Sequence, residues 1–499
     1  MRWKRATGAV LAATIMTQPI AAQTDSTAPA PEKASTQKPE GKETGSARAE
    51  ALRTIDVWLD AQQAYDHVPA LSAAIVRGDA IVWSKGYGTI DAAHTVPATA
   101  TTIYSICSIS KLFTSVALMQ QWEAGKVSLD APLTTYLPWA ALKPVTEDSV
   151  PITLRGALTH SAGLPREADF PYWSGPDYPF PTQAEIRAMI GKQAPLFPAS
   201  RWFQYSNLGL TLVGDTVEAV SGTPYADYVQ AHILGPLALK DTHPFMPMQL
   251  YGTRLAVGWG ALDRKGERPL LKPFDARGIQ PAAGFTSTAE DLARFAIWQF
   301  RLLRTGTPEI LKASTLREMQ RVQFTSPDWK TTWGLGFSVR RRDGQTYVGH
   351  GGDCPGYHTN LSMRPETETA VVTMATGAEN PGPYGNAMFA LLDKRRTYAF
   401  KAPAPVAVDL EAYAGHYAAQ PWQAETVVLP WAGGLAVMDL PTRDPAGDLD
   451  FLKPKGGDLF RAVRDDGSEA DEVRFERDAR GKVIRMIRFS NPETKTGGL

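Results

Sequence analysis

Apolar and polar residues follow helical patterns along some stretches of this chain and form short strand-like runs along others. Helices are predicted at 47–65 and at 104–125, the second of them apolar over most of its length. Between them, residues 70–91 form two strand-like runs hinged at Arg77-Gly78-Asp79. A further helix is predicted from Ser287, which has Glu290 at the spacing of a capping box.

Strand-like runs return after residue 330. Four of them are joined by short turns and precede a last predicted helix at 387–396; the runs are 332–342, 345–352, 357–365 and 367–376. Because strands at both ends of this region enclose helices, they have to meet in one sheet from distant parts of the chain. The predicted fold class is therefore α/β (α+β), a sheet packed by helices with a helical insert.

The last part of the chain has a different pattern. Short strands are broken by Gly-Gly, Asp-Gly and Arg-Gly turns about every ten residues. This spacing predicts a small all-β barrel or sandwich at 405–499. The Pro-rich stretch 401–410 separates it from a larger domain predicted at 49–400.

The first residues carry targeting rather than folding information. Residues 1–22 have a basic head, an apolar stretch and small residues at the end, which predicts a signal peptide and export to the periplasm or the medium. An uncleaved membrane anchor is the weaker interpretation, since the apolar run stops short of the ~20 residues a spanning helix needs. Residues 23–48 have almost nothing to bury and are predicted to be a disordered linker.

Composition and charge narrow the choice of partner. The 499 residues are 43% hydrophobic and 21% charged, as in ordinary soluble proteins. Lys plus Arg number 52 and Asp plus Glu number 52, so no net field attracts nucleic acid or an anionic membrane. With only two cysteines, a zinc cluster is not expected, and no cofactor or metal is implied. A small molecule or a peptide is left as the expected partner.

Candidate chemistry begins at the apolar helix 104–125. Ser108 and Lys111 are three residues apart and therefore share one helix face. A nucleophilic serine needs a base in contact with it, and lysine can serve if burial and nearby positive charge lower its pKa. The same spacing at Ser35 and Lys38 lies in the predicted linker, so the pair alone is not specific.

Two further motifs supply the companions. Tyr205-Ser206-Asn207 precedes a predicted helix and offers a phenol to move protons and an amide to hold a substrate carbonyl or the lysine. His350-Gly351-Gly352 ends a predicted strand, where two glycines would let a substrate lie flush against the strand edge. A lone histidine at a strand end can also simply bond locally, and His160 is interpreted as structural.

In this order, the three motifs resemble those of the serine β-lactamase and penicillin-binding-protein-like hydrolases, closest to the class C β-lactamase and esterase branch. The resemblance covers about residues 50–400. It implies an antiparallel sheet flanked by helices, with an all-helical lobe and the active site between them. The C-terminal part resembles the small lipocalin-like barrel that some members carry.

The resemblance also implies roles. Ser108 attacks, Lys111 and Tyr205 act as general base and acid, and Asn207 orients the substrate. The backbone N–H groups of Ser108 and Asp353 form the oxyanion hole. His350, Gly351 and Gly352 form the strand edge of the site, with His350 as a further catalytic residue.

One departure from the family pattern shapes the functional prediction. Members that bind β-lactams commonly have Lys-Thr-Gly or Lys-Ser-Gly where this chain has His350-Gly351-Gly352, so the group that grips the drug's carboxylate is altered. An ester or a peptide, including a D-amino-acid peptide, is the favoured substrate of an exported serine hydrolase. The alternatives are a β-lactamase, and a penicillin-binding or peptidoglycan-sensing module without efficient turnover.

The two cysteines and one loop complete the predictions. In the carbapenemase branch of class A β-lactamases, cysteines placed like Cys107 and Cys354 are bonded, which implies a disulfide here, whereas the alternative is two reduced, buried thiols. The loop 166–182 crowds aromatic residues and prolines together. It can be a rigid packed loop, a wall of the substrate pocket, or both.

Overall fold

The computed structural model describes residues 45–377, 380–397 and 408–499. The predicted signal peptide 1–22, most of the predicted linker 23–48 and most of the junction 401–410 lie outside the described residues. Helix α1 (Gly45–Tyr65) already begins inside the stretch predicted as linker.

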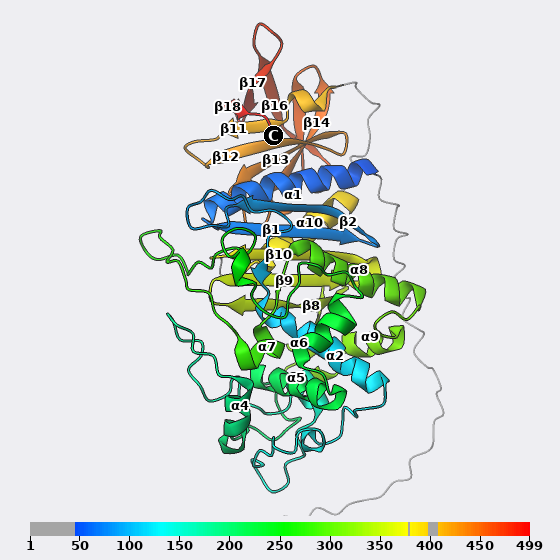
Figure 1. The fold of residues 1–499 in the computed structure, drawn as a ribbon. Coiled ribbons are helices and arrows are strands. Elements are labelled where there is room, and N and C mark those ends of the chain that lie inside the picture. The colour runs from blue at the N-terminus through cyan, green and yellow to red at the C-terminus, as the bar shows by residue number, and fades with distance from the viewer. Residues whose placement is uncertain (1–44, 378–379, 398–407) are drawn as a thin grey trace, which may run out of the picture. The chain divides into compact units, whose positions relative to one another are not determined.

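One large sheet organises the part of the fold before the barrel, residues 45–397 (Figure 1). Its eight strands lie in the order β2-β1-β10-β9-β8-β7-β6-β5, and every pairing is antiparallel. The early hairpin thus joins the late strands, as predicted, through β1 beside β10. The strands are β1 (Ala70–Arg77), β2 (Ala80–Gly88), β5 (Phe324–Thr325), β6 (Thr332–Trp333), β7 (Ser338–Arg342), β8 (Gln345–Cys354), β9 (Tyr357–Arg364) and β10 (Thr369–Thr376).

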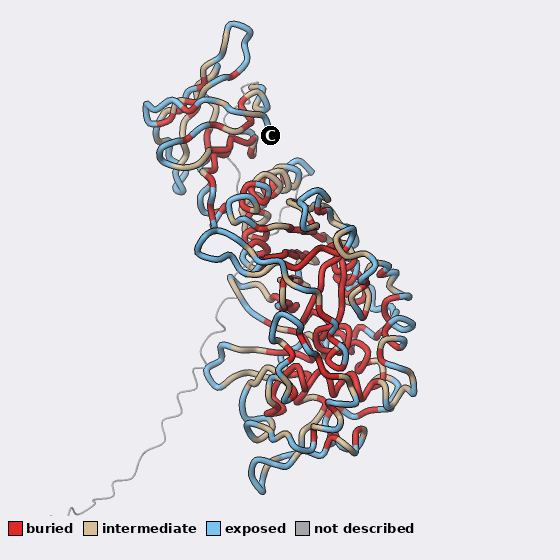
Figure 2. Tube along the Cα trace, turned by 60° about the vertical axis from the view of Figure 1, so that its left-hand side comes forward, coloured by how far each residue is buried: buried red, intermediate tan, exposed pale blue. Residues whose placement is uncertain are grey.

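The two faces of this sheet belong to two hydrophobic cores. Successive side chains of a strand point to opposite faces, so Val371 lies in the core shared with α1 and α10 (Gly382–Thr397), and Val372 lies in the core shared with the helical lobe. Figure 2 shows the buried residues along the sheet and the helices packed on it. The central strands β1 and β10 are therefore buried on both faces, and the helical lobe lies on the face opposite α1.

The helical lobe is assembled from the middle of the chain. It contains α2 (Ser110–Glu123), α3 (Leu154–Leu158), α4 (Gln183–Met189), α5 (Asn207–Ser221), α6 (Tyr225–Val229), α7 (Gln280–Ala283), α8 (Ala289–Thr305) and α9 (Ala313–Gln320). The capping box predicted at Ser287 and Glu290 is wrong by one residue. Thr288 caps α8 and accepts from the Asp291 N–H at 3.1 Å, because Ser287 belongs to the short strand β4 (Thr286–Ser287).

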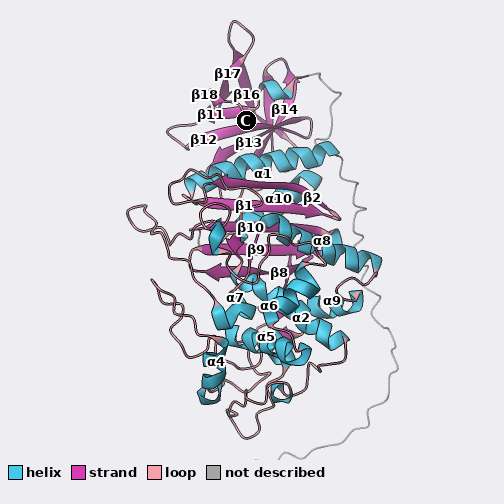
Figure 3. Cartoon of the chain, in the orientation of Figure 1, coloured by secondary structure: helices cyan, strands magenta, loops and turns pink. Residues whose placement is uncertain are grey.

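The predicted all-β part is a closed barrel of eight strands (Figure 3). Consecutive strands pair antiparallel, and β11 pairs with β18 to close the ring. The strands are β11 (Gly415–Ala418), β12 (Glu425–Trp431), β13 (Gly434–Leu440), β14 (Leu449–Gly456), β15 (Leu459–Val463), β16 (Glu469–Arg477), β17 (Val483–Arg488) and β18 (Asn491–Gly497). The predicted fold class is thus confirmed, with a barrel rather than a sandwich.

Candidate active site

Ser108 sits on a tight turn rather than inside a helix. The turn is the 3-10 segment Cys107–Ile109, which leads into α2. Cys107 has φ +49°, a left-handed conformation that is unfavourable for any residue except glycine and clusters at functional sites. Ser110 braces the turn by donating to the Cys107 carbonyl at 2.5 Å and accepting from the Phe285 N–H at 3.0 Å. The turn holds the Ser108 hydroxyl at the surface of a cleft.

Lys111 contacts Ser108 directly. Its Nζ donates to Ser108 Oγ at 3.0 Å and to the carbonyl oxygen of Ala282 in α7 at 2.7 Å. The side chain is completely buried, and this burial lowers the pKa of Lys111 well below its ordinary value. A neutral amine beside a hydroxyl is the arrangement that a general base requires.

Tyr205 is the third member of the cluster. It precedes α5, whose N-cap Ser206 accepts from the Gly209 N–H at 2.9 Å. The phenol interacts with Ser108, and Lys111 Nζ lies 4.9 Å from the centre of its ring. Burial raises the pKa of Tyr205 above its ordinary value, so the phenol keeps its proton at neutral pH. His160 packs beside the ring and accepts from the Ser206 N–H at 3.1 Å, as a structural residue would.

Asn207 is held by the carboxylate of Glu167, a residue outside the three sequence motifs. Glu167 accepts from Asn207 Nδ2 at 2.6 Å and from Trp173 Nε1 at 2.9 Å, and Tyr172 donates its hydroxyl to the other oxygen. Arg166 Nε lies 3.5 Å from the same carboxylate. No hydrogen bond joins Asn207 to Lys111 among the described residues, so the interpretation of Asn207 as a lysine holder finds no contact here.

His350 lies on the free edge of β8. Pairing of β7 with β8 ends at Ser338 opposite Gly349, and beyond this point β8 is paired on its other side with β9 only. Burial lowers the pKa of His350 to about 3, and its Nδ1 is 2.5 Å from the Gly351 carbonyl oxygen. The imidazole is therefore neutral at physiological pH, with Nδ1 as the donor. It cannot supply the fixed positive charge of a lysine at this position.

The two glycines after His350 serve different purposes. An added Cβ on Gly352 would lie 2.2 Å from the Ile106 carbonyl oxygen. Gly352 therefore lets β8 approach the turn that carries Ser108, Cys107–Ile109 with the preceding Ile106, which we call the nucleophile turn. An added Cβ on Gly351 would meet nothing closer than 3.7 Å, and this residue faces the cleft. The prediction that both glycines bind substrate stays a prediction: Gly351 has room on the cleft side, whereas Gly352 packs against Ile106.

The predicted disulfide between Cys107 and Cys354 is present. The two Cα atoms are 5.8 Å apart, within the range for a disulfide. The bond ties the residue before Ser108 to the end of β8. Asp353, proposed to share the oxyanion hole through its backbone, lies directly before this bond and directs its side chain to solvent, where His358 Nδ1 is 3.3 Å away.

The cleft has two lobes that meet at Ser108, Arg166 and Asp353. One has a volume of about 440 Å³ and is lined by the aromatic pair Trp173 and Trp259 among others. The other has a volume of about 860 Å³ and is lined by Tyr205, His350, Gly351, Asn360, Asn386 and the arginines of β7. Loop 166–182 thus contributes Arg166 and Trp173 to the wall, as one interpretation of it predicted.

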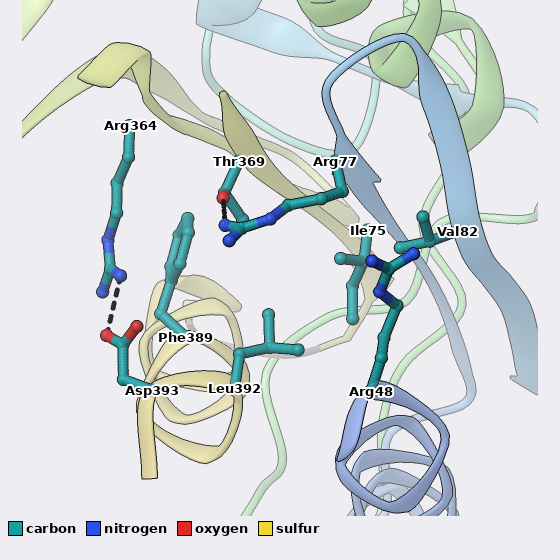
Figure 4. A pocket seen from close by; sticks show the side chains of 9 residues that line it. All are labelled: Arg48, Ile75, Arg77, Val82, Arg364, Thr369, Phe389, Leu392 and Asp393. Carbon is teal, nitrogen blue, oxygen red and sulfur yellow. Dashed lines mark hydrogen bonds and ion pairs between the residues drawn. The ribbon is translucent and has the colours of Figure 1, made fainter. Parts of the chain in front are cut away.

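A third cavity, between the sheet and helices α1 and α10, has no serine among the described residues that line it, whereas Ser108 lines the cleft (Figure 4). It holds only about 20 Å³, and its charged groups already make contacts: Arg364 pairs with Asp393 at 2.7 Å, and Arg77 donates to Thr369. Across residues 45–377, 380–397 and 408–499 we also find no group of acidic, histidine and cysteine residues arranged for a metal ion. Within the same ranges no helix has the length and apolarity needed to cross a bilayer. The Ser108 cleft is the candidate active site.

Known proteins share this architecture. A family model described as beta-lactamase matches residues 55–394. The D-alanyl-D-alanine-carboxypeptidase/endopeptidase AmpH of Escherichia coli strain K12 is 27% identical over 329 residues, which cover 61% of this chain and 79% of that protein. Beta-lactamase-like protein 2 of Dictyostelium discoideum is 25% identical over 320 residues, or 63% of this chain and 57% of that protein. Putative beta-lactamase-like 1 of Homo sapiens is 28% identical over 353 residues, or 67% and 66%. The chain thus spans less than two thirds of the last two relatives.

Solved structures agree in fold. The octameric penicillin-binding protein homologue from Pyrococcus abyssi superposes with a TM-score of 0.60 at 24% identity, covering 89% of this chain and 99% of that chain. A D-stereospecific amidohydrolase from Streptomyces gives a TM-score of 0.57 at 23% identity, covering 68% and 98%. At these identities the likeness concerns the fold.

Proposed function

Because the chain belongs to the beta-lactamase family, we propose that it is a serine hydrolase that cleaves an ester or an amide, including a D-amino-acid peptide, through an acyl-enzyme on Ser108. The observation that carries this proposal is the 3.0 Å contact between Ser108 Oγ and the buried Lys111 amine. Tyr205 completes the cluster, since the centre of its ring lies 4.9 Å from Lys111 Nζ.

The acylation step follows from these contacts. Neutral Lys111 takes the proton of Ser108 as Oγ attacks the substrate carbonyl, and the backbone N–H groups of Ser108 and Asp353 stabilise the resulting oxyanion. Tyr205, protonated because its pKa is raised, gives a proton to the leaving group and regains one from Lys111. In deacylation the same pair takes a proton from the water that attacks the acyl-enzyme and passes it to Ser108 Oγ as the acyl–oxygen bond breaks, which frees Ser108.

The chemistry of the strand edge supports the choice of substrate. A β-lactam presents a carboxylate next to its reactive carbonyl, and a fixed cation is the natural partner for that group. Here the pKa of His350 is lowered to about 3, so the residue is neutral, and Gly351 has no hydroxyl. We therefore place ester or peptide turnover above β-lactam turnover. Export is part of the proposal, supported by residues 1–22 and by a disulfide of the kind that persists in oxidising compartments.

Activity-based labelling tests the proposal. A fluorophosphonate should form one adduct, on Ser108, and the Ser108→Ala variant should lose the adduct while keeping the wild-type circular dichroism spectrum. The ratio of kcat/KM values should favour a short-chain p-nitrophenyl ester or a D-alanyl peptide over nitrocefin. An adduct on another serine would refute the nucleophile, and efficient nitrocefin hydrolysis would favour the β-lactamase alternative. Stable acylation by penicillin without any turnover would favour the binding or sensing module.

A further inference from the structure

The Glu167 carboxylate contacts several side chains and has no part in the proposed reaction steps. It receives three side-chain hydrogen bonds, from Asn207, Trp173 and Tyr172, and lies beside Arg166. Its side chain is only 19% exposed, so these donors offset much of the cost of burying a charge. Such a concentration of donors on one carboxylate beside a catalytic cluster indicates a role in shaping that cluster.

One consequence concerns the amide of Asn207. An ionised carboxylate only accepts hydrogen bonds, so the amide nitrogen must face Glu167 and Oδ1 must point the other way. Asn207 Oδ1 is buried and has no hydrogen-bond partner among the described residues. The orientation of Asn207, which lines the same cavity as Ser108, is thus set by Glu167.

A second consequence concerns charge around Lys111. The titratable groups that face this amine are Tyr205, His160, His350, Arg166 and Glu167. Burial lowers the pKa of both histidines below their ordinary values and raises that of Tyr205, so these three groups stay neutral near physiological pH. Arg166 and Glu167 are the two members of this set that carry charge there.

The two charges act in opposite directions. The Arg166 guanidinium lies 5.1 Å from the centre of the Tyr205 ring, the same ring that lies 4.9 Å from Lys111 Nζ. Burial is the main reason that the pKa of Lys111 is lowered; the charge of Glu167 raises that pKa, and the charge of Arg166 lowers it further. Arg166 and Glu167, which are adjacent in the sequence, thus shift the pKa of the Lys111 amine in opposite directions.

We propose that Arg166 and Glu167 are positioning residues of this active site: Glu167 fixes the amide of Asn207, and the two opposite charges, placed beside Asn207 and the Tyr205 ring, act on the Lys111 amine. The inference rests on the proposed role of Lys111 as general base. Arg166 and Glu167 do not react; they act through Asn207 and Lys111.

The test is the pH dependence of the second-order rate constant for fluorophosphonate labelling of Ser108. Labelling should fall at low pH as Lys111 becomes protonated. Glu167→Gln should move this acidic limb to lower pH and Arg166→Gln should move it to higher pH, each by about half a unit or more. Asp169→Asn is the matched control, because it removes one charge from the same loop at an exposed residue, and the limb should stay where it is.

The outcomes separate this inference from the proposed function. Wild-type protein that is not labelled on Ser108 would overturn the proposed function and the inference with it. Labelling with limbs that stay fixed in both variants, or that move in the same direction, would overturn the inference alone. A limb that moves equally in Asp169→Asn would also overturn it, because the effect would then belong to the charge of the loop as a whole. If Glu167→Gln folds poorly, the upward shift in Arg166→Gln still decides the question of charge.

Discussion

Two buried basic residues, one in each part of the fold, differ in the kind of partner that they contact. Lys111, in the hydrolase part (residues 45–397), is 0% exposed and makes no ion pair among the described residues. Its partners are a hydroxyl and a carbonyl. Arg488 in the barrel is 6% exposed and donates to Asp439 Oδ1 at 2.8 Å and to Glu493 Oε1 at 3.0 Å.

The effects on the two pKa values follow from this difference. Burial lowers the pKa of Lys111, and the charge of Glu167 opposes this effect only in part. Burial would also lower the pKa of Arg488, but the hydrogen bonds and charges of Asp439 and Glu493 outweigh it, and the pKa is raised. The barrel therefore keeps its buried cation charged for structure, while the hydrolase part leaves its amine free to lose a proton. Functional sites commonly retain such unfavourable groups at a cost in stability.

The sharpest test of this contrast is Lys111→Met. Removing the base should lower kcat/KM by about 10⁴-fold, a loss typical of a member of a catalytic cluster. The wild-type folded state binds fewer protons at Lys111 than the unfolded state does, so its stability rises as the pH increases toward the ordinary lysine value. The variant should lack this part of the pH dependence, and its Tm at neutral pH should not fall below that of the wild type.

Steady-state kinetics and thermal melts at several pH values check this prediction. A marked fall in Tm at neutral pH would show that the Lys111 amine contributes to stability, and the contrast with Arg488 would disappear.

Arg488→Met should do the reverse. It leaves Glu493, which is 11% exposed, with an uncompensated negative charge, and breaking a buried pair in this way is strongly destabilising. Because Asp439 is 40% exposed and can be solvated, we expect a loss of about 3 kcal/mol in the free energy of unfolding rather than more. Hydrogen exchange should show the loss in β17 and β18. Ester turnover at low temperature should be retained, and its loss would mean that the barrel takes part in the active site.

The disulfide distinguishes the two parts again, since both cysteines belong to the hydrolase part. The bond closes a loop with a sequence separation of 247 residues, and the Cys107→Ala/Cys354→Ala variant should lose about 2 to 5 kcal/mol of stability. Hydrogen exchange in the barrel strands should stay unchanged. Thiol titration of the unfolded, unreduced wild type should find no free thiol, and two thiols per chain would refute the bond.

Much of this architecture could be predicted because the information is local or ordered along the chain. The strand-like runs ended at turns, and Ser108, Tyr205 and His350 occurred in the order of a known family. The pairing of Cys107 with Cys354 followed from a resemblance to the carbapenemase branch of class A β-lactamases. These features depend on the identity and order of residues along the chain, which can be read directly from the sequence.

The parts that were missed depend on packing between distant segments. Glu167 gains its importance from Trp173 and Asn207, which reach it only after the loop folds onto α5. The neutral state of His350 is a consequence of burial, which no motif contains. Gly351 and Gly352 look equivalent in the sequence, yet only one of them lies against the nucleophile turn.

The two glycines provide the last and smallest of the expected effects. In Gly352→Ala, the new Cβ would lie 2.2 Å from the Ile106 carbonyl oxygen, a backbone atom that cannot turn aside, so β8 must move away from Ser108. We expect a loss of about 1 to 3 kcal/mol, as for overpacking in a core, and slower labelling of Ser108. Gly351→Ala is the matched control, because its Cβ would find 3.7 Å of room, so stability should hold and only KM should change. Equal losses of stability in both variants would show that the strand edge, not the Ile106 contact, limits the site.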